Sequence, residues 1–585
     1  MKNTKKTDVN VPGCDHERRR WRNRSVGLKI IVVLILLSVH ALATNFALAQ
    51  DPSTLRIGHA EKEPQNWLSF YGDYRGWSYS RLNQIKRENV GKLVPVWAFP
   101  AGFPPANIGL KAGLEATPLV IDGVLYLEGM QNNIYAVDAA TGRTLWTYLY
   151  KWPAAMTISI RGARGLAFGD GRIFMGTQDN HLVAVDAQTG EQVWNTHVEE
   201  NSECKCRITS APLFAKGKVI VGNAGSGYEH LRGHVNAYDA KTGALLWHFE
   251  VVPSPGEPGS DTWVGAGDNY WKTGGGGTWF TGTYDPELNL IYWGTGDPTP
   301  RDDSTRSSGA NLYTDSLLAL DADTGKLKWY FQETPHDLYD YDSASEPIII
   351  DLDIGGRKRK VLLHPSKNGF VYVYERDTGR FLYAFAYSSV TWAKSIGADG
   401  RPVDTVIPKQ QQDFLICPSM RTGARGIQHS TYSPHTGWWY TTDFEICTHL
   451  KDGAGPDALN PKVPPNISAF DPVTGEKKWT FTTKYYNMSS LLATDGDLIF
   501  GGDLQGDVFA LDARTGQKLW SFNTGGRIAS APVSFSVRGK QYIAIASGGG
   551  SESETQLTHF YPDSIGHIPE PTSNLFVFAL PEKNR

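Results

Sequence analysis

The chain has few cysteines, little net charge and few of the common metal-binding motifs. Only five of its 585 residues are cysteines, and none lies in a Cys-x-x-Cys-His motif, which excludes a covalently attached c-type haem within these residues. The 15 histidines include no His-Glu-x-x-His spacing, which excludes that zinc-protease pattern. A formal net charge of −4 lacks the basic footprint of a nucleic-acid-binding protein, so we expect no nucleic-acid partner.

The beginning of the chain differs from the rest. Residues 1–49 hold nine Lys/Arg against three acidic residues, which leaves a formal net charge of −10 for the remainder. The basic part is followed by an apolar run, Ile30–Val39, and by Ala47-Leu48-Ala49. This order is typical of a cleaved export signal, and the apolar run is short for a membrane span. We therefore expect a signal peptide over 1–49, one mature domain over 50–585, a periplasmic location and no stable membrane span.

Glycine and large aromatic residues are abundant, and they recur in a fixed pattern. The chain has 61 glycines, 18 tryptophans and 26 tyrosines, which suits short β-strands joined by tight turns. The pattern is an apolar residue, Asp, two small or variable residues, Thr-Gly, three residues and Trp. Its copies are VDAATGRTLW, VDAQTGEQVW, YDAKTGALLW, LDADTGKLKW, YERDTGRFLY, FDPVTGEKKW and LDARTGQKLW, beginning at Val137, Val185, Tyr238, Leu320, Tyr374, Phe470 and Leu511.

The spacing of these copies predicts the fold class. A period near fifty residues with about four strands per unit is typical of the blades of a β-propeller. A further tryptophan, Trp97, has no Asp-Thr-Gly turn before it, as expected if the N- and C-terminal strands complete an eighth blade together. The sequence therefore predicts an all-β, eight-bladed propeller. Two wide gaps between copies predict insertions, at Pro253–Gly277 with Pro298–Asn311 and at Ala386–Arg425 with Thr448–Pro465, that cover the central channel.

An acidic loop, Thr334–Glu346, follows one of the tryptophan strands closely. It contains four acids, Asp337, Asp340, Asp342 and Glu346. Carboxylates so close together repel each other unless water, a cation or a changed protonation state separates them. Alone, this loop reads as a solvated acidic turn. In a propeller the same loop lies between two blades near the axis, where ligands bind.

The segment Asn66–Phe99 resembles the start of pyrroloquinoline quinone (PQQ)-dependent alcohol dehydrogenases. The resemblance covers nearly all of residues 66–550. It continues through LEATPLV, TSAPLFAKGKVIVGNAG, YDPELNLIYWGTG, TPHDLYDYD, PSKNGFVYV and GRIASAPVSFSVRGKQYIAIASGGG. That family is an eight-bladed propeller that holds PQQ and a metal ion on its axis, so the resemblance implies the same fold and these two cofactors.

The resemblance also implies roles for the acidic loop. Asp340 in HDLYD matches the general base that takes the proton of the alcohol, and Asp297 in GTGDP stands where the family usually has a metal-binding Asn. Asp342 resembles the extra metal ligand of the lanthanide-dependent branch. A metal site with Asp297, Asp340 and Asp342 implies Ca²⁺ or a lanthanide ion, because more negative charge favours a trivalent ion. Asp337 is expected to orient the turn.

Other matches imply the cofactor site. The matching residues are Glu115, Arg164, Thr209, Ala224, Gly225, Trp279 and Lys367. Five of them have a plainer alternative: Trp279 as a packing residue between blades, Glu115 as a turn cap, Thr209 as a strand hydroxyl, Arg164 as an ion-pair partner and Lys367 as a solvated turn lysine.

The sequence also departs from the family. The family's adjacent cysteines, which stack a disulfide over the quinone, fall on Ile158-Ser159, and a metal-ligand Glu falls on Gly227, with Glu229 two residues further on. We keep Glu229 as a fourth candidate metal ligand. Cys417 and Cys447 are expected to form a disulfide, since they border a loop-rich stretch in an oxidising compartment. Cys204 and Cys206 stay unassigned.

The sequence therefore predicts a periplasmic, haem-free PQQ-dependent alcohol dehydrogenase. Its expected partners are a small alcohol and a separate cytochrome c that accepts the electrons. The oligomeric state, a homodimer included, stays open. Two alternatives also stay open: a degenerate family member that has lost metal or cofactor, and a non-catalytic propeller that binds proteins.

Overall fold

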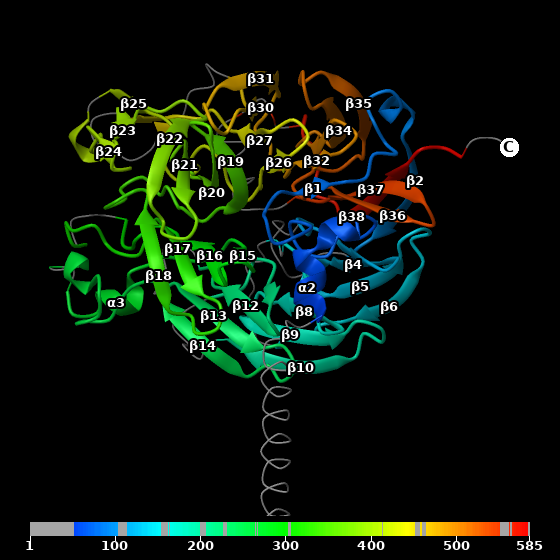
Figure 1. Ribbon diagram of the computed structural model, residues 1–585, viewed down its shortest axis with the longest axis horizontal. Coiled ribbons are helices and arrows are strands. Elements are labelled where there is room, and N and C mark those ends of the chain that lie inside the picture. The colour runs from blue at the N-terminus through cyan, green and yellow to red at the C-terminus, as the bar shows by residue number, and fades with distance from the viewer. Residues whose placement is uncertain are drawn as a thin grey trace, which may run out of the picture. The chain divides into compact units, whose positions relative to one another are not determined.

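The computed structural model describes most of the chain from Pro52 onward (Figure 1). It leaves out 1–51, 103–113, 154–161, 163, 199–205, 226–230, 264, 266, 302–305, 412, 451–456, 459–463, 550–560, 562–563, 565 and 583–585. The expected signal peptide lies outside the described residues. Within the described part, no helix is long and apolar enough to cross a membrane.

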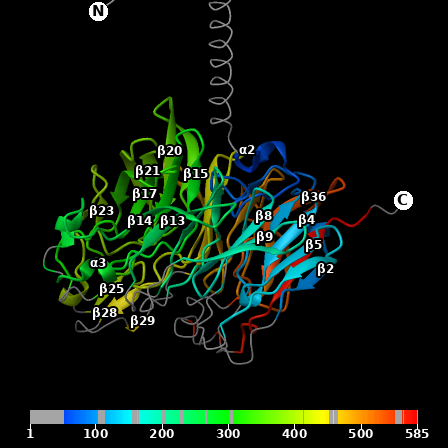
Figure 2. The same cartoon turned by 90° about the horizontal axis from the view of Figure 1, so that it is seen from below.

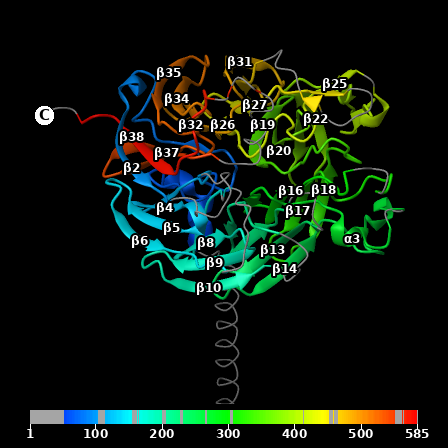
Figure 3. The ribbon, with the colours of Figure 1, turned by 180° about the vertical axis from the view of Figure 1, so that it is seen from behind.

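The described strands form ten sheets, and eight of them are arranged as the blades of a propeller, which confirms the predicted fold class (Figures 1 and 3). The first two blades contain β3 (Leu119–Ile121), β4 (Val124–Glu128), β5 (Ile134–Asp138) and β6 (Thr144–Tyr148), then β7 (Ala167–Gly169), β8 (Arg172–Gly176), β9 (His181–Asp186) and β10 (Gln192–His197). The next two contain β11 (Leu213–Ala215), β12 (Lys218–Gly222), β13 (His234–Asp239) and β14 (Leu245–Glu250), then β15 (Thr283–Asp285), β16 (Leu290–Gly294), β17 (Ser316–Asp321) and β18 (Leu327–Gln332).

The remaining blades complete the ring. The fifth and sixth contain β19 (Ile348–Ile354), β20 (Arg357–Pro365), β21 (Phe370–Glu375) and β22 (Phe381–Ala386), then β26 (Thr431–Ser433), β27 (Trp438–Asp443), β30 (Asn466–Phe470) and β31 (Lys477–Thr482). The seventh contains β32 (Leu492–Thr494), β33 (Leu498–Gly502), β34 (Asp507–Asp512) and β35 (Lys518–Asn523), with β1 (Tyr79–Ser80) added in parallel to β32. In Figure 1 the first strands of the blades, such as β15, β19 and β32, lie nearest the middle of the ring.

Both ends of the described chain contribute to the eighth blade, as predicted. Its strands are β2 (Val94–Pro100), β36 (Val533–Val537), β37 (Lys540–Ser547) and β38 (Asn574–Ala579). β2 pairs antiparallel with β38, so the outermost strand comes from the beginning of the propeller and the other three from its end. This pairing joins segments that lie more than 470 residues apart in the sequence. It closes the ring, because the strands from the two ends of the propeller pair with each other in one sheet.

Each repeat motif packs one blade against the next through its glycine and tryptophan. In the fourth blade, the Asp321 carboxylate accepts backbone N–H groups from Asp323 and Thr324, which shapes the turn after β17. Gly325 follows with a φ of +69°, and a Cβ there would lie 2.5 Å from the Trp247 ring. The indole N–H of Trp247 donates to the carbonyl of Ala322 at 3.2 Å. The motif thus needs glycine both for its backbone conformation and for the close approach of the ring.

The two insertions carry the short elements outside the blades. They include η4 (Ser260–Trp263), α3 (Tyr270–Thr273), β23 (Ser395–Ile396), β24 (Pro402–Val403), η5 (Pro408–Gln410), β25 (Phe414–Ile416), β28 (Thr448–Leu450) and β29 (Asp457–Ala458). α3 and β23–β25 lie at the outer margin of the ring, and α3, β25 and β28 lie toward the same side of it (Figures 1 and 2). The second insertion also reaches the acidic loop, because Arg421 N–H donates to the carbonyl of Tyr339 at 2.8 Å.

Short helices and an aliphatic core complete the structure. The remaining helices are α2 (Pro52–Gly58), η1 (Ala60–Lys62), η2 (Val90–Lys92) and η3 (Met130–Asn132). Within the blades, second and third strands such as β16 and β17 are almost wholly buried, and their side chains form continuous clusters with those of neighbouring blades. This burial removes a large apolar area from water and holds the inner loops in fixed positions.

Candidate active site and metal centre

The acidic loop between β18 and β19 is buried, so its interpretation as a solvated turn is wrong. Asp340 and Asp342 are each 7% exposed and Glu346 is fully buried. Asp337 shapes the loop as predicted: its two carboxylate oxygens accept the N–H groups of Tyr339 and Tyr341, both at 2.7 Å. These bonds hold the loop in a turn in which Asp340 has a φ of 67°. In this turn the carboxylates of Asp340 and Asp342 both contact Lys367.

Three acids from two loops meet at this place. Asp297 follows β16, and carboxylate oxygens of Asp297, Asp340 and Asp342 lie within 4.8 Å of one another. The N–H of Asp297 donates to Asp342 Oδ1 at 3.0 Å, and a Cβ at Gly296 would lie 2.5 Å from the same oxygen. We call these three residues the acid triad. The predicted metal ligands other than Glu229 are thus brought together, and a set of carboxylate oxygens is what Ca²⁺ and lanthanide ions prefer.

Lys367, which follows β20, bridges two members of the acid triad. Its Nζ lies 2.9 Å from Asp340 Oδ1 and 2.8 Å from Asp342 Oδ2, so it is not a solvated turn lysine. Burial raises the pKa of Asp340 well above that of an ordinary aspartate, although Lys367 acts in the opposite direction. Burial also acts to raise the pKa of Asp342, but the charge and hydrogen bond of Lys367 outweigh it and lower that pKa.

Further acids surround the triad and give the site an excess of negative charge. Asp315 is fully buried just before β17, and neither of its carboxylate oxygens has a hydrogen-bond partner among the described residues. Burial and then Asp337 raise the pKa of Asp315 well above its ordinary value, and burial raises that of Asp337 to about 6. The charge of Arg306 acts in the opposite direction on both pKa values, but the Asp315 carboxylate still has no hydrogen-bond partner in the described part of the chain. A carboxylate buried in this way beside other acids is costly, so the residues present fit a bound metal ion.

The predicted cofactor residues enter from the loops before the first strands of adjacent blades. Arg164 precedes β7, and its Nη1 donates to Thr209 Oγ1 at 3.1 Å and to the carbonyl of Trp279 at 2.9 Å. Arg164 Nε lies 3.9 Å from Glu115 Oε2, and its guanidinium carbon lies 5.4 Å from the Trp279 ring centre. The structure thus brings Glu115, Arg164, Thr209 and Trp279 into one group.

The surroundings of this group fit a flat, anionic cofactor. A Cβ at Gly162 would lie 2.4 Å from the Glu115 carboxyl carbon, so a side chain at that position would fill the space beside Glu115. The ring of Trp279 is half-buried and contacts Phe280 and Arg164, whereas the repeat tryptophans contact glycines of the next blade. An open indole face beside an arginine can stack a planar ring that carries carboxylates.

Ala224 and Gly225 lie in the loop after β12, next to the same group. Ala224 exchanges two backbone hydrogen bonds of 2.8 Å with Arg207, and Asn223 accepts the N–H of Thr278 at 2.9 Å. This pairing places Ala224 between the segment that carries Thr209 and the segment that carries Trp279. A Cβ on Gly225 would lie 3.3 Å from Leu231 Cδ1.

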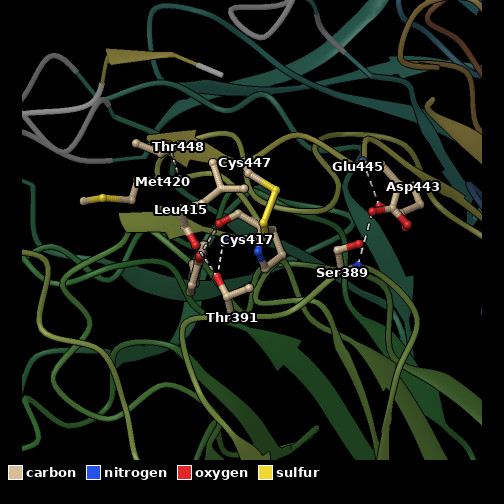
Figure 4. The surroundings of a disulfide bond; sticks show 11 residues. Ser389, Thr391, Leu415, Cys417, Met420, Asp443, Glu445, Cys447 and Thr448 are labelled. Atoms are coloured by element: carbon tan, nitrogen blue, oxygen red, sulfur yellow. Dashed lines mark hydrogen bonds between the residues drawn. A yellow bond between two sulfur atoms is a disulfide. The ribbon is translucent and has the colours of Figure 1, made fainter. Parts of the chain in front are cut away.

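The disulfide between Cys417 and Cys447 is confirmed, with a Cα–Cα distance of 4.4 Å (Figure 4). It joins the two parts of the second insertion beside the loop that contacts Tyr339. Cys206, unassigned from the sequence, is also disulfide-bonded. Cys204, Glu229, Gly227 and Ile158-Ser159 lie outside the described residues.

Sequence reasoning missed two residues at the site, Arg301 and Asp315. Arg301 Nε lies 2.7 Å from Asp297 Oδ2, and its Nη2 lies 2.6 Å from Asp340 Oδ2. The sequence signal for Arg301 is its position four residues after Asp297 in DPTPR, and this segment lies outside the repeat motif. Asp315 gives no comparable signal, because its sequence context is that of an ordinary strand start.

The sequence of the described propeller also matches a known protein family. The model described as "Glucose/ethanol/alcohol dehydrogenase, beta-propeller domain" matches residues 67–413, which is more than half of the chain. The chain belongs to the PQQ-dependent alcohol dehydrogenase family. It is therefore a quinoprotein oxidoreductase that acts on CH–OH groups. A second model, for the outer membrane protein assembly factor BamB, matches residues 465–553.

Several members of this quinoprotein family are similar over most of their length. The chain is 35% identical over 529 residues to the quinohemoprotein alcohol dehydrogenase of Comamonas testosteroni, covering 83% of this chain and 73% of that protein. It is 34% identical over 571 residues to the quinoprotein alcohol dehydrogenase PedH of Pseudomonas putida, covering 90% and 92%.

Two solved structures share the arrangement of blades. Alcohol dehydrogenase ADHIIG of Pseudomonas putida superposes with a TM-score of 0.81 at 31% identity, covering 92% of this chain and 84% of that chain. A europium-containing methanol dehydrogenase superposes with a TM-score of 0.78 at 30% identity, covering 89% and 99%. Relatives with and without haem in their names are thus similar to this quinoprotein to nearly the same degree.

Proposed function

We propose that this protein oxidises a small alcohol to an aldehyde or ketone, with Asp340 as the general base. The observation that carries the proposal is the position of Asp340: it is buried, it belongs to the acid triad, and it lies 2.9 Å from Lys367. Burial raises its pKa well above the ordinary value, which makes the ionised carboxylate a better proton acceptor than a surface aspartate.

The chain's own residues have distinct tasks in this proposal. When bound, PQQ would supply the hydride acceptor and the metal ion a Lewis acid. Glu115, Arg164, Thr209 and Trp279 would hold and stack the cofactor, with Ala224 and Gly225 lining the same side. Asp340 accepts the hydroxyl proton of the alcohol, and Lys367 keeps Asp340 and Asp342 in place by its two hydrogen bonds. The surrounding aromatic and aliphatic side chains exclude water from this reaction.

The metal ion is proposed to be Ca²⁺ or a lanthanide held by Asp297, Asp340 and Asp342, with Glu229 as a fourth candidate. Three carboxylates beside the unpaired Asp315 give more negative charge than a neutral amide ligand would, which supports a trivalent ion. The likeness to a europium-containing methanol dehydrogenase points in the same direction.

We further propose that the enzyme is haem-free and exported. The 585 residues contain no Cys-x-x-Cys-His motif, so electrons are proposed to pass to a separate cytochrome c. The basic and apolar segment over 1–49 is proposed as a signal peptide that directs the domain over 50–585 to the periplasm. The Cys417–Cys447 disulfide supports an oxidising compartment.

Reconstitution tests this function. The purified protein is stripped of metal and cofactor, loaded with PQQ and either CaCl₂ or LaCl₃, and assayed for dye-linked oxidation of ethanol. We expect oxidation with at least one metal, and retention of quinone absorbance after gel filtration. No oxidation with either metal, and no retained quinone, would show that this chain is a degenerate member or a binding scaffold instead.

Two variants test whether the metal-supported oxidation depends on the acid triad. Asp342→Ala removes one triad carboxylate, so we expect it to abolish La³⁺-supported oxidation more completely than Ca²⁺-supported oxidation. Asp351→Ala is a matched control, because Asp351 is an exposed residue of β19 in the adjacent blade. Full La³⁺-supported activity in Asp342→Ala would contradict the lanthanide assignment.

A further inference from the structure

Arg301 occupies the oxygens that a metal ion at the acid triad would use. Its Nε binds Asp297 Oδ2 at 2.7 Å and its Nη2 binds Asp340 Oδ2 at 2.6 Å, so one guanidinium spans two of the three carboxylates. The neighbouring acids act strongly enough to raise the pKa of Arg301 despite the opposing effect of burial. Arg301 is therefore a permanent positive charge at the place proposed for the ion.

Lys367 covers the remaining side of the triad. It binds Asp340 Oδ1 and Asp342 Oδ2, while Asp342 Oδ1 accepts the N–H of Asp297. Both oxygens of Asp340 and both of Asp342 are thus already engaged by the protein. A metal ion at these carboxylates therefore has to share their oxygens with the two cationic side chains or displace one of them.

The two cations differ in how firmly they are held. The main chain of Lys367 accepts the N–H of Ala424 at 2.9 Å, and a Cβ on Gly423 would lie 2.1 Å from Lys367 Cγ, so the lysine stem is enclosed. The side chain of Arg301 is 28% exposed, against 11% for Lys367. Arg301 is therefore the more solvent-exposed of the two cations.

We propose that Arg301 is an internal competitor of the metal ion and that its charge limits how strongly the site prefers a trivalent over a divalent ion. The proposal rests on the metal site of the proposed function and adds a residue to it. Only three residues separate Arg301 from Asp297, so the displaced guanidinium stays near the ion and continues to repel it. Coulomb repulsion scales with the charge of the ion, so a lanthanide is penalised more than Ca²⁺.

The expected size follows from this scaling. At a separation of about 6 Å and an effective dielectric constant between those of protein and water, repulsion by one unit charge weakens binding roughly tenfold per unit of ion charge. Replacement of Arg301 by glutamine should therefore raise the affinity for Ca²⁺ roughly 100-fold and that for Tb³⁺ roughly 1,000-fold. A larger increase in affinity for Tb³⁺ than for Ca²⁺ would show that charge causes the effect, because a purely steric effect would change both affinities to a similar degree.

Direct metal titration tests the proposal without an activity assay. The metal-free full-length protein and its Arg301→Gln variant are titrated with TbCl₃, followed by sensitised Tb³⁺ luminescence, and with CaCl₂ as a competitor. We expect both affinities to rise in the variant, and the Tb³⁺/Ca²⁺ affinity ratio to rise about tenfold. Arg301→Lys keeps the positive charge, so its Tb³⁺/Ca²⁺ affinity ratio should stay close to that of the wild type.

The control and the contrary outcomes are distinct. Arg380→Gln removes an exposed arginine that pairs with Glu375 on β21, and it should leave both affinities unchanged. Unchanged affinities in Arg301→Gln, or an equal increase for both ions, would overturn the competitor role. If the wild type and every variant bind neither ion at millimolar concentration, the metal site of the proposed function fails instead. Should Arg301→Gln not fold, Arg301→Met is titrated in its place, and unchanged affinities or an equal increase for both ions there would also overturn the proposal.

Discussion

Aspartates of the repeat turns and aspartates of the acid triad are the same side chain in opposite surroundings. In the turns, a carboxylate such as that of Asp321 lies at the margin of a blade and accepts backbone N–H groups. Burial acts to raise the pKa of Asp321, but the hydrogen bonds of Thr324 and the charge of Lys328 outweigh it and lower the pKa. In the triad, burial dominates at Asp340 and raises the pKa well above its ordinary value.

This difference separates residues that stabilise the fold from residues that serve the reaction. A turn aspartate is ionised, partly hydrated and satisfied by its own backbone, so it needs nothing from outside the blade. The acids around Asp340 are buried, and one of them, Asp315, has no hydrogen-bond partner among the described residues. Unfavourable burial of this kind is maintained by the surrounding blades and is typical of functional sites.

The largest expected effect comes from removing the base. Asp340→Asn keeps the size of the side chain but removes the proton acceptor and one triad charge, so kcat/KM for alcohol oxidation should fall by about 10³-fold. Thermal unfolding should show no loss of stability, because the neutral amide is easier to bury than a carboxylate. The measurement is dye-linked oxidation by the reconstituted enzyme together with a melting curve.

The matched control for that experiment is Asp321→Asn. It makes the same chemical change in a turn, so the activity should stay within about twofold of the wild type because no substrate approaches that turn. A comparable loss of activity in both variants would mean that Asp340 acts through the stability of the propeller and is not the base.

The fold could be predicted because each blade is specified by a local pattern. Asp, Thr-Gly and Trp act within about ten residues, and Gly325 beneath Trp247 shows why the glycine and the ring must occur together. The closing strand was also predictable, since Trp97 occurs without a turn motif of its own. The pairing of Cys417 with Cys447 followed from their positions at the ends of a loop-rich stretch.

The site could be predicted only in part. The acidic loop and Lys367 stand in recognisable motifs, but the burial of Asp340 and Asp342 depends on contacts from distant blades. The Arg301 contact depends on how the loop after β16 folds back on itself, which no periodic pattern encodes. The orphan carboxylate of Asp315 appears only when the neighbouring loops are in place, because its local sequence matches an ordinary strand start.

A second prediction concerns the docking of blades. Gly325→Ala adds a methyl group at a φ of +69° and 2.5 Å from the Trp247 ring, so it should cost about 2–4 kcal/mol through backbone strain and overpacking. Gly356→Ala in the β19–β20 turn is the control, because its φ is +74° but no atom lies within 4 Å of the added Cβ. It should cost only about 1 kcal/mol. Equal losses in urea unfolding would show that the ring contact contributes nothing.

The smallest expected effect is that of a single turn aspartate, and its pH dependence shows the contrast with the triad. Asp321→Ala removes the acceptor for Asp323 and Thr324 N–H, which should cost about 1 kcal/mol at pH 7. The pKa of Asp321 is lowered in the folded state from 3.8, so its stabilisation is fully present above pH 3.8 and is lost as the pH falls through the lowered value.

Urea unfolding at pH 7 and near pH 3 measures the difference in the free energy of unfolding between wild type and variant, which should shrink at the lower pH. A difference that grows toward pH 3 would contradict the lowered pKa and place Asp321 with Asp340, whose raised pKa favours the protonated form in the folded protein.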